Sequence, residues 1–125
     1  MGRNVQMNFL FVALGGALGA SGRYAISLIP LRSQFPFLTL LTNLFGAVLI
    51  GFVVGIAESR GTSKNAVLFW KTGVCGGFTT FSTFSLEACT LLGNKSYGLC
   101  ALYIVLSVVG CIAGVCCGKK TASLL

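Results

Sequence analysis

The sequence predicts an all-α membrane protein with four transmembrane helices in a single domain covering residues 1–125. Hydrophobic residues make up 55% of the chain and charged residues only 9%, whereas a soluble domain carries about 25% charged residues. Long uncharged stretches alternate with short charged loops, and about 20 apolar residues suffice to cross the hydrocarbon core of a bilayer. A chain of this length is not expected to contain a second domain.

The first two predicted membrane helices end at proline or at charged residues. The first covers residues 5–29 and continues beyond Arg23 to end near Pro30. The second covers residues 35–57, where no charge occurs before Glu58. Each is long enough to cross the hydrocarbon core.

The last two predicted membrane helices cover residues 66–92 and 96–118, and the fourth is uncharged up to Lys119. Four crossings joined by short loops would place both termini on the same side of the membrane. Glycines four positions apart predict close helix packing, because small residues let helix backbones approach each other in lipid. These glycines are Gly15 and Gly19, Gly51 and Gly55, and Gly110, Gly114 and Gly118.

The third predicted helix is interrupted by the sequence GVCGGFTTFSTFSLE at Gly73–Glu87. Gly76 and Gly77 lack side chains and permit non-helical backbone. Thr79 and Thr80 are β-branched and disfavour a regular helical turn. In hydrocarbon, non-helical backbone survives only where protein or a water-filled cavity surrounds it. We therefore expect a broken third helix at an ion or substrate site.

Several classes of function are excluded by composition. The net charge of +7 does not indicate nucleic-acid binding, because the basic residues are spread over segment ends and form no compact stripe. The chain has no histidine, so no imidazole can bind a metal or act as a base. The six cysteines lie in apolar runs without a CxxC pair and are expected to be free thiols. No acid–base pair or activated nucleophile is visible, so we expect no enzyme activity.

The distribution of basic residues favours termini in the cytoplasm, because cytoplasmic loops carry the excess of lysine and arginine. Six of the basic residues fall on the side of the termini and the second loop, and three fall on the opposite side. The first group is Arg3, Arg60, Lys64, Lys71, Lys119 and Lys120, and the second is Arg23, Arg32 and Lys95.

Polar residues inside the membrane helices are candidates for lining an ion pathway. Thr39 and Asn43 are four positions apart and therefore share a face of the second helix. An amide within an uncharged helix needs a partner, so Asn43 either bonds to another helix or donates to a passing anion. The other polar groups expected on this track are Tyr103, Ser107 and Cys111 on the fourth helix and Ser82 and Thr83 on the third.

Four further residues of the first and third helices each have two interpretations. Arg23 either extends to the membrane interface or forms an electropositive vestibule that attracts anions. Glu87 either lies near a helix end or carries protons or a cation inside the membrane. Phe81 and Phe84 share a helix face. They either pack against lipid and protein or turn their positive ring edges toward a small anion.

Three stretches of the chain carry a resemblance to a known family. They are Gly15–Tyr24 (GGALGASGRY), Thr42–Gly46 (TNLFG) and Gly73–Phe84 (GVCGGFTTFSTF). In these stretches, in their order and in the four-helix layout, the sequence resembles the Fluc (CrcB) fluoride channels over nearly the whole chain. The resemblance supplies fluoride as the ion, since composition and spacing indicate only a small-ion pathway.

The resemblance implies an antiparallel, dual-topology homodimer with two fluoride pores built from both subunits. Phe81 and Phe84 match the phenylalanines whose ring edges contact fluoride, and Asn43 matches the pore asparagine. A structural sodium ion is implied at the dimer interface, bound by the backbone carbonyls of Gly76 and Thr79 from each subunit. The residues matching the polar track are Ser82, Thr83, Tyr103 and Ser107, with Thr39 on the Asn43 face and Arg23 in the vestibule.

The family further implies passive fluoride export across the prokaryotic plasma (inner) membrane, with fluoride, sodium and membrane lipid as partners and no nucleic acid. The rival class is a small four-helix proton-coupled exporter of the multidrug-resistance type. Such exporters use a carboxylate in the first helix, and this chain has none there. A non-transporting interaction subunit would fit the packing glycines but would leave the interrupted third helix unexplained. Pairing with an oppositely oriented paralogue is the alternative to the homodimer, which we prefer.

Overall fold

The computed structural model describes residues 2–125, and its three longest elements are α1 (Arg3–Ser27), α2 (Phe37–Arg60) and α6 (Tyr97–Ser123). Each of these helices is long and apolar enough to cross a membrane. They coincide with the predicted helices at 5–29, 35–57 and 96–118, and α6 continues past the predicted end. The predicted all-α class is confirmed.

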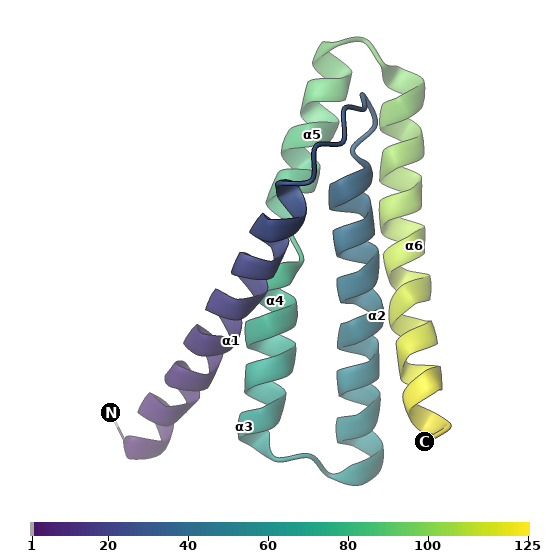
Figure 1. The fold of residues 1–125 in the computed structure, drawn as a ribbon. Helices are drawn as coiled ribbons and strands as arrows, with labels where there is room; N and C mark the ends of the chain where they lie inside the picture. The colour runs from purple at the N-terminus through teal and green to yellow at the C-terminus, as the bar shows by residue number, and fades with distance from the viewer. Residues whose placement is uncertain (1) are drawn as a thin grey trace.

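The third predicted crossing, at 66–92, is divided among four short elements that run nearly in line between α1 and α2 and on toward α6 (Figure 1). These are α3 (Lys64–Val67), the π-helix η1 (Leu68–Cys75), α4 (Gly76–Phe78) and α5 (Phe81–Gly93). Between α4 and α5, Thr79 and Thr80 have extended backbone, with φ/ψ of −79°/154° and −149°/115°. The four elements together retain the length of the predicted segment, although each is too short to cross a membrane as a helix by itself.

Local sequence signals explain where the helices begin and end. α2 begins after Pro36 and ends at Gly61, whose φ of 67° is the left-handed conformation that glycine adopts readily at helix C-termini. α3 begins at Ser63, whose hydroxyl accepts a hydrogen bond from the Ala66 amide at 3.3 Å. Two of the turns joining the segments are therefore specified by short-range chemistry.

Glycines predicted to allow close packing lie at the closest helix contacts. α2 and α6 pack along their length (Figure 1), and a Cβ added at Gly118 would overlap the carbonyl oxygen of Val48. α1 packs instead on η1 and α4. There, a Cβ at Gly19 would overlap the carbonyl oxygen of Val74. Small residues thus set the positions of α6 against α2 and of the third segment against α1.

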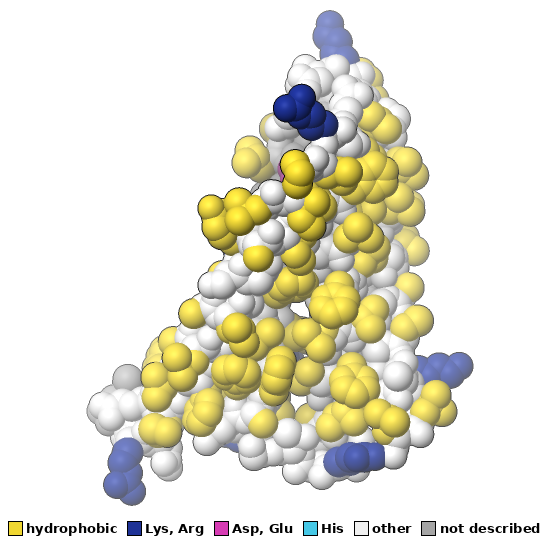
Figure 2. Space-filling view, in the orientation of Figure 1, with side chains coloured by type: hydrophobic (Ala, Val, Ile, Leu, Met, Phe, Trp, Pro, Cys, Tyr) yellow, Lys and Arg dark blue, Asp and Glu magenta, His cyan; other side chains and the backbone are white. Residues whose placement is uncertain are grey.

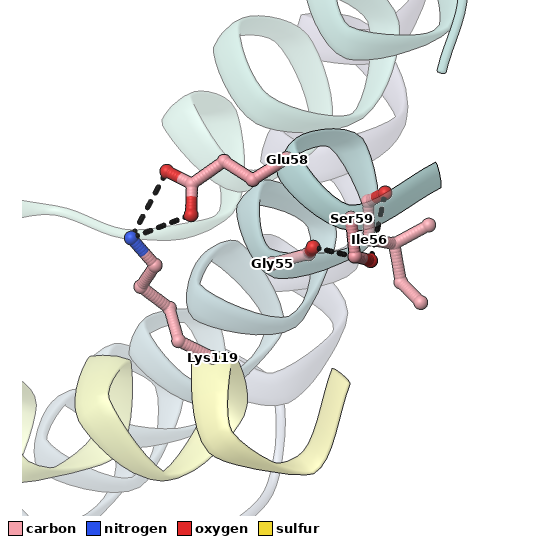
Figure 3. Close-up of polar contacts among 5 residues, drawn as sticks. All are labelled: Gly55, Ile56, Glu58, Ser59 and Lys119. Atoms are coloured by element: carbon pink, nitrogen blue, oxygen red, sulfur yellow. Dashed lines mark hydrogen bonds and ion pairs between the residues drawn. The ribbon is translucent and has the colours of Figure 1, made fainter. Parts of the chain in front are cut away.

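Charged groups gather at the two ends of the bundle, and hydrophobic side chains cover much of the face between them (Figure 2). At the end that holds both termini (Figure 1), the Lys119 ammonium pairs with the Glu58 carboxylate at 2.9 Å (Figure 3). At the next residue of α2, the Ser59 hydroxyl donates to the Gly55 carbonyl at 2.9 Å (Figure 3). Polar ends around an apolar middle, with three membrane-length helices, are the features of an integral membrane protein.

Candidate functional site

Asn43 on α2 forms a two-way hydrogen-bonded pair with the extended backbone between α4 and α5. Its Nδ2 donates to the Thr80 carbonyl at 3.0 Å, and its Oδ1 accepts from the Thr80 amide at 2.7 Å. The side-chain oxygen of Asn43 therefore takes the place of the main-chain carbonyl that a continuous helix would have supplied to the Thr80 amide. Of the two interpretations of Asn43, the bond to another helix segment is present, and one Nδ2 hydrogen remains for a further acceptor.

The interruption leaves main-chain carbonyls at the end of α4 without their helical donors. In a continuous helix the Thr80 amide would bond to the Gly76 carbonyl and the Thr83 amide to the Thr79 carbonyl. Instead, the Thr80 amide bonds to Asn43 and the Thr83 amide bonds to the Thr80 hydroxyl at 3.1 Å. Within residues 2–125, no hydrogen bond reaches the Gly76 or Thr79 carbonyl across the interruption.

Arg23 is directed toward this same helix end. Its Nε donates to the Gly77 carbonyl at 3.2 Å, which replaces another of the helical donors lost at the interruption. Arg23 also lines a small cavity of about 70 Å³ together with Thr39, Thr80 and Thr83. The guanidinium is thus bonded to the third segment, and both interpretations of Arg23, an electropositive vestibule or extension to the membrane interface, stay predictions.

Hydroxyl groups cluster at the first turn of α5. The Thr80 hydroxyl caps the helix by accepting from the Thr83 amide. It also lies 3.2 Å from the Ser82 hydroxyl and donates to the Thr83 hydroxyl at 3.1 Å. Ser82 and Thr83, both predicted beside an ion track, are therefore brought together around Thr80.

Phe81 and Phe84 are neighbours with very different surroundings. Their ring centroids lie 5.4 Å apart, but Phe81 is 77% exposed whereas Phe84 is 8% exposed. The Phe84 ring also packs 5.0 Å from the Tyr103 ring of α6. Phe84 is therefore fixed by the core, and Phe81 beside it projects from the surface of the chain.

A cavity of about 350 Å³ lies between α2, α5 and α6 at the level of the interruption. Its wall is mostly apolar, as is common for ligand sites, with a few polar groups placed in it. The buried Ser107 hydroxyl makes no hydrogen bond within the described residues, so this polar atom is available to a ligand or water. The other predicted site residues on the wall are Asn43, Thr79, Phe81, Phe84 and Cys111.

Glu87 bonds to two residues that were predicted to line the ion pathway, Thr39 and Tyr103. The position of Glu87 in the sequence did not reveal this contact. Its carboxylate accepts from the Thr39 hydroxyl of α2 at 2.8 Å and from the Tyr103 hydroxyl of α6 at 2.6 Å. Thr39 and Tyr103 therefore meet at Glu87 and do not line the large cavity. One feature of the sequence could have placed Glu87 near the site: it lies three residues after Phe84 and therefore on the same face of α5.

Among the described residues, the site offers main-chain oxygens and, on the cavity wall, the single thiol of Cys111. No group of three or more histidine, cysteine or acidic side chains gathers in the described part of the chain. The six cysteines are free thiols, as predicted. A hard cation, which prefers oxygen ligands, would have to bind the carbonyls left without donors at the end of α4.

Comparison with known proteins identifies the family. The family described as "CrcB-like protein, Camphor Resistance (CrcB)" matches residues 10–119, which include every residue of the candidate site. The chain belongs to the CrcB family.

Proteins named as fluoride-specific ion channels resemble the chain over most of its length. A protein named fluoride-specific ion channel FluC 2 from Nitrobacter hamburgensis is 45% identical, over 86% of this chain and 94% of its own. The fluoride-specific ion channel FluC of Ruegeria sp. is 47% identical, over 90% and 92% respectively. That of Clostridium perfringens is 42% identical, over 93% and 94%.

These CrcB relatives are named as channels and not as enzymes, in agreement with the predicted lack of enzyme activity. They give no support to the alternative of a proton-coupled multidrug exporter, which the geometry also disfavours. The carboxylate that lies within the bundle, Glu87, belongs to α5 and accepts hydrogen bonds from the hydroxyls of Thr39 and Tyr103. The first helix, α1, has no carboxylate at all.

Proposed function

We propose that this protein is a fluoride-selective channel through which fluoride leaves the cell passively, lowering its cytoplasmic concentration. The observation that carries the proposal is the cavity at the interruption of the third segment. It combines two phenylalanine rings, an amide and an unpartnered hydroxyl, contributed by Phe81, Phe84, Asn43 and Ser107. The names of the CrcB relatives support fluoride as the ion.

The polar groups of the cavity can replace the water shell of a small anion. Fluoride is strongly hydrated, so a pore must offer hydrogen-bond donors as it removes water. The second Nδ2 hydrogen of Asn43 and the hydroxyl of Ser107 can donate, and the ring edges of Phe81 and Phe84 add weaker positive contacts. Such contacts are strong enough to admit the ion and weak enough to release it.

Two antiparallel subunits, each contributing to both pores, would complete this pathway. Phe81 lies beside the cavity but is 77% exposed, which suits a ring that reaches toward a second subunit. Gly76 is also exposed, and no atom outside its own helix lies within 4 Å of the place where its Cβ would stand. An open face with an aromatic ring at its edge is what an antiparallel homodimer would cover.

A structural sodium ion fits the centre of this interface. The Gly76 and Thr79 carbonyls have lost their helical donors, and carbonyl oxygens are the ligands that hard cations prefer. Two such carbonyls from each subunit would hold the ion and fix the distance between the two interruptions. The ion would thereby stabilise the dimer without taking part in fluoride transfer.

Export by this channel needs no energy source beyond the membrane potential. A potential that is negative inside drives a monovalent anion outward by about 2.3 kcal/mol per 100 mV. The plasma (inner) membrane of a prokaryote provides this potential, and we place the protein there.

Fluoride efflux from proteoliposomes, measured with a fluoride electrode, tests the proposal. The wild-type chain should release fluoride, and Phe81→Ile, Phe84→Ile and Asn43→Ala should each lose most of that flux. Phe9→Ile is the matched control, because Phe9 is exposed on α1 and does not line the cavity. Unchanged flux in all three cavity variants would refute the assignment of the pathway.

A further inference from the structure

We propose that Cys111 is a binding site for a soft, thiophilic metal ion, and that occupation of this site closes the cavity. The consequence for transport rests on the proposed fluoride pathway, but the site itself follows from the position of the thiol. Cys111 is partly exposed and lies on the wall of the 350 Å³ cavity.

The other cysteines lack this position. Cys75 and Cys100 are buried in the protein, and the Cys100 thiol donates to the Ala88 carbonyl at 3.5 Å. The remaining three thiols are exposed and do not line the cavity: Cys89, Cys116 and Cys117. A reagent that enters the cavity therefore meets one thiol among those that the structure describes.

Ser107 supplies an independent sign that a ligand fits beside Cys111. It lies one helical turn before Cys111 on α6 and on the same face, and it lines the same cavity. Ser107 is only 6% exposed, and its hydroxyl has no hydrogen-bond partner in the described chain. Because an unpartnered buried hydroxyl is unfavourable, a ligand that accepts a hydrogen bond there would be stabilised.

Mercury(II) chloride has the chemistry that this pair recognises. The neutral molecule can enter an apolar cavity, and a thiolate is the protein ligand that soft metals prefer. The S–H bond breaks with its electron pair staying on sulfur, the Hg–S bond forms, and one chloride leaves with the proton as HCl. No oxidation or reduction occurs. The chloride that remains on mercury can accept a hydrogen bond from the Ser107 hydroxyl.

The resulting adduct would occupy the space that an anion needs. Asn43, Phe81 and Phe84 line the same cavity as Cys111, and a cavity of about 350 Å³ holds the volume of only about twelve waters, at roughly 30 Å³ each. A mercury chloride group attached to its wall would therefore exclude fluoride from the polar groups around it.

Two measurements on the full-length chain in proteoliposomes test the site. In the first, intact-mass spectrometry follows mercury chloride addition to a variant in which every cysteine except Cys111 is replaced by serine. In the second, each variant's fluoride efflux with mercury chloride is divided by its own efflux without it. The variants are the wild type, Cys111→Ser and, as a control on the same helix, Cys117→Ser.

We expect one mercury adduct on the variant that keeps Cys111, and its loss after treatment with a dithiol. We expect loss of most of the flux for the wild type and for Cys117→Ser, and little loss for Cys111→Ser. Absence of the adduct, or equal inhibition of Cys111→Ser and wild type, would overturn the proposal. An adduct on the variant that keeps only Cys111, together with a wild type that passes no fluoride even without mercury chloride, would keep the metal site and reject only the proposed function.

Discussion

At the residue scale, Asn43 determines how the chain can leave and re-enter helical geometry inside an apolar bundle. A backbone amide and carbonyl without partners each cost about 1–3 kcal/mol when buried. The Asn43 side chain satisfies both groups of Thr80, at 2.7 Å and 3.0 Å. An ionised aspartate or a hydrophobic residue at this position could not do both, because an ionised carboxylate only accepts hydrogen bonds and a hydrophobic side chain makes none.

Asn43→Asp should therefore destabilise the protein and reduce fluoride efflux. The carboxylate can still accept from the Thr80 amide, but it cannot donate to the Thr80 carbonyl and it places a negative charge on the cavity wall. We expect a loss of about 1–3 kcal/mol of unfolding free energy, seen as a lower unfolding midpoint in detergent. Asn65→Asp is the control, since Asn65 is exposed on α3 and surface substitutions usually change stability by less than about 0.5 kcal/mol.

At the scale of elements, the third segment combines a π-helix, a short α-helix, two extended residues and α5 along one direction (Figure 1). Contacts with α1 on one side and α2 on the other hold this segment in position. α1 approaches closely at Gly19, and α2 supplies Asn43. By contrast, within residues 2–125 no hydrogen bond reaches the carbonyls of Gly76 and Thr79 across the interruption, and the proposed sodium site rests on this observation.

Sodium should therefore be required for the assembled channel. We expect protein purified with N-methylglucamine in place of sodium to show a lower unfolding midpoint and little fluoride efflux, because the carbonyls would repel one another across the interface. Restoring sodium should recover both properties, and the same concentration of potassium should recover less. Equal stability and flux with and without sodium would count against the proposed ion.

The packing of α6 on α2 provides a second test at this scale. Gly118→Ala should destabilise the protein, because the added Cβ would overlap the Val48 carbonyl and force the two helices apart; overpacking typically costs about 1–3 kcal/mol. Gly98→Ala is a control on the same helix, where the added Cβ meets no atom within 4 Å. Removing a glycine from an open helical position should be neutral or stabilising by up to about 1 kcal/mol. Unfolding midpoints measured in detergent compare the two variants, and equal midpoints would contradict the close contact.

Patterns along the chain predicted the elements well but not the contacts between them. Runs of apolar residues predicted three helices to within a few residues. Of the residues expected to interrupt the third helix, Gly76 and Gly77 lie in α4, and only Thr79 and Thr80 have extended backbone. The pairing of Asn43 with Thr80 and the meeting of Thr39 and Tyr103 at Glu87 depend on how α2 and α6 are rotated against α5. Residues far apart in the chain carry no signal of that rotation in a single sequence.

At the scale of the whole molecule, the distribution of charge affects which side of the membrane the two termini face. Both termini lie at the same end of the bundle (Figure 1), together with the Lys119–Glu58 ion pair (Figure 3). Because Glu58 is one of only two acidic residues in the chain, most of the basic charge at this end has no acidic partner. Basic residues favour the cytoplasmic side, yet an antiparallel homodimer requires the same chain to insert in both directions.

The antiparallel homodimer predicts that the excess of basic residues is too small to fix one orientation. A reporter fused after Leu125 should therefore be active in part of the population when it works only in the cytoplasm, and in the rest when it works only outside. Lys119→Gln and Lys120→Gln together should raise the fraction of chains with the reporter outside, because they remove two positive charges from the terminal end.

The reverse test removes a positive charge from the opposite end. Arg23 and Lys95 are unsuitable for it, since Arg23 bonds to Gly77 and Lys95 has an unusual φ of 58°. Arg32→Gln is suitable, and it should lower the outside fraction. A single orientation, combined with no fluoride efflux from proteoliposomes that hold only this chain, would reject the homodimer in favour of pairing with an oppositely oriented paralogue.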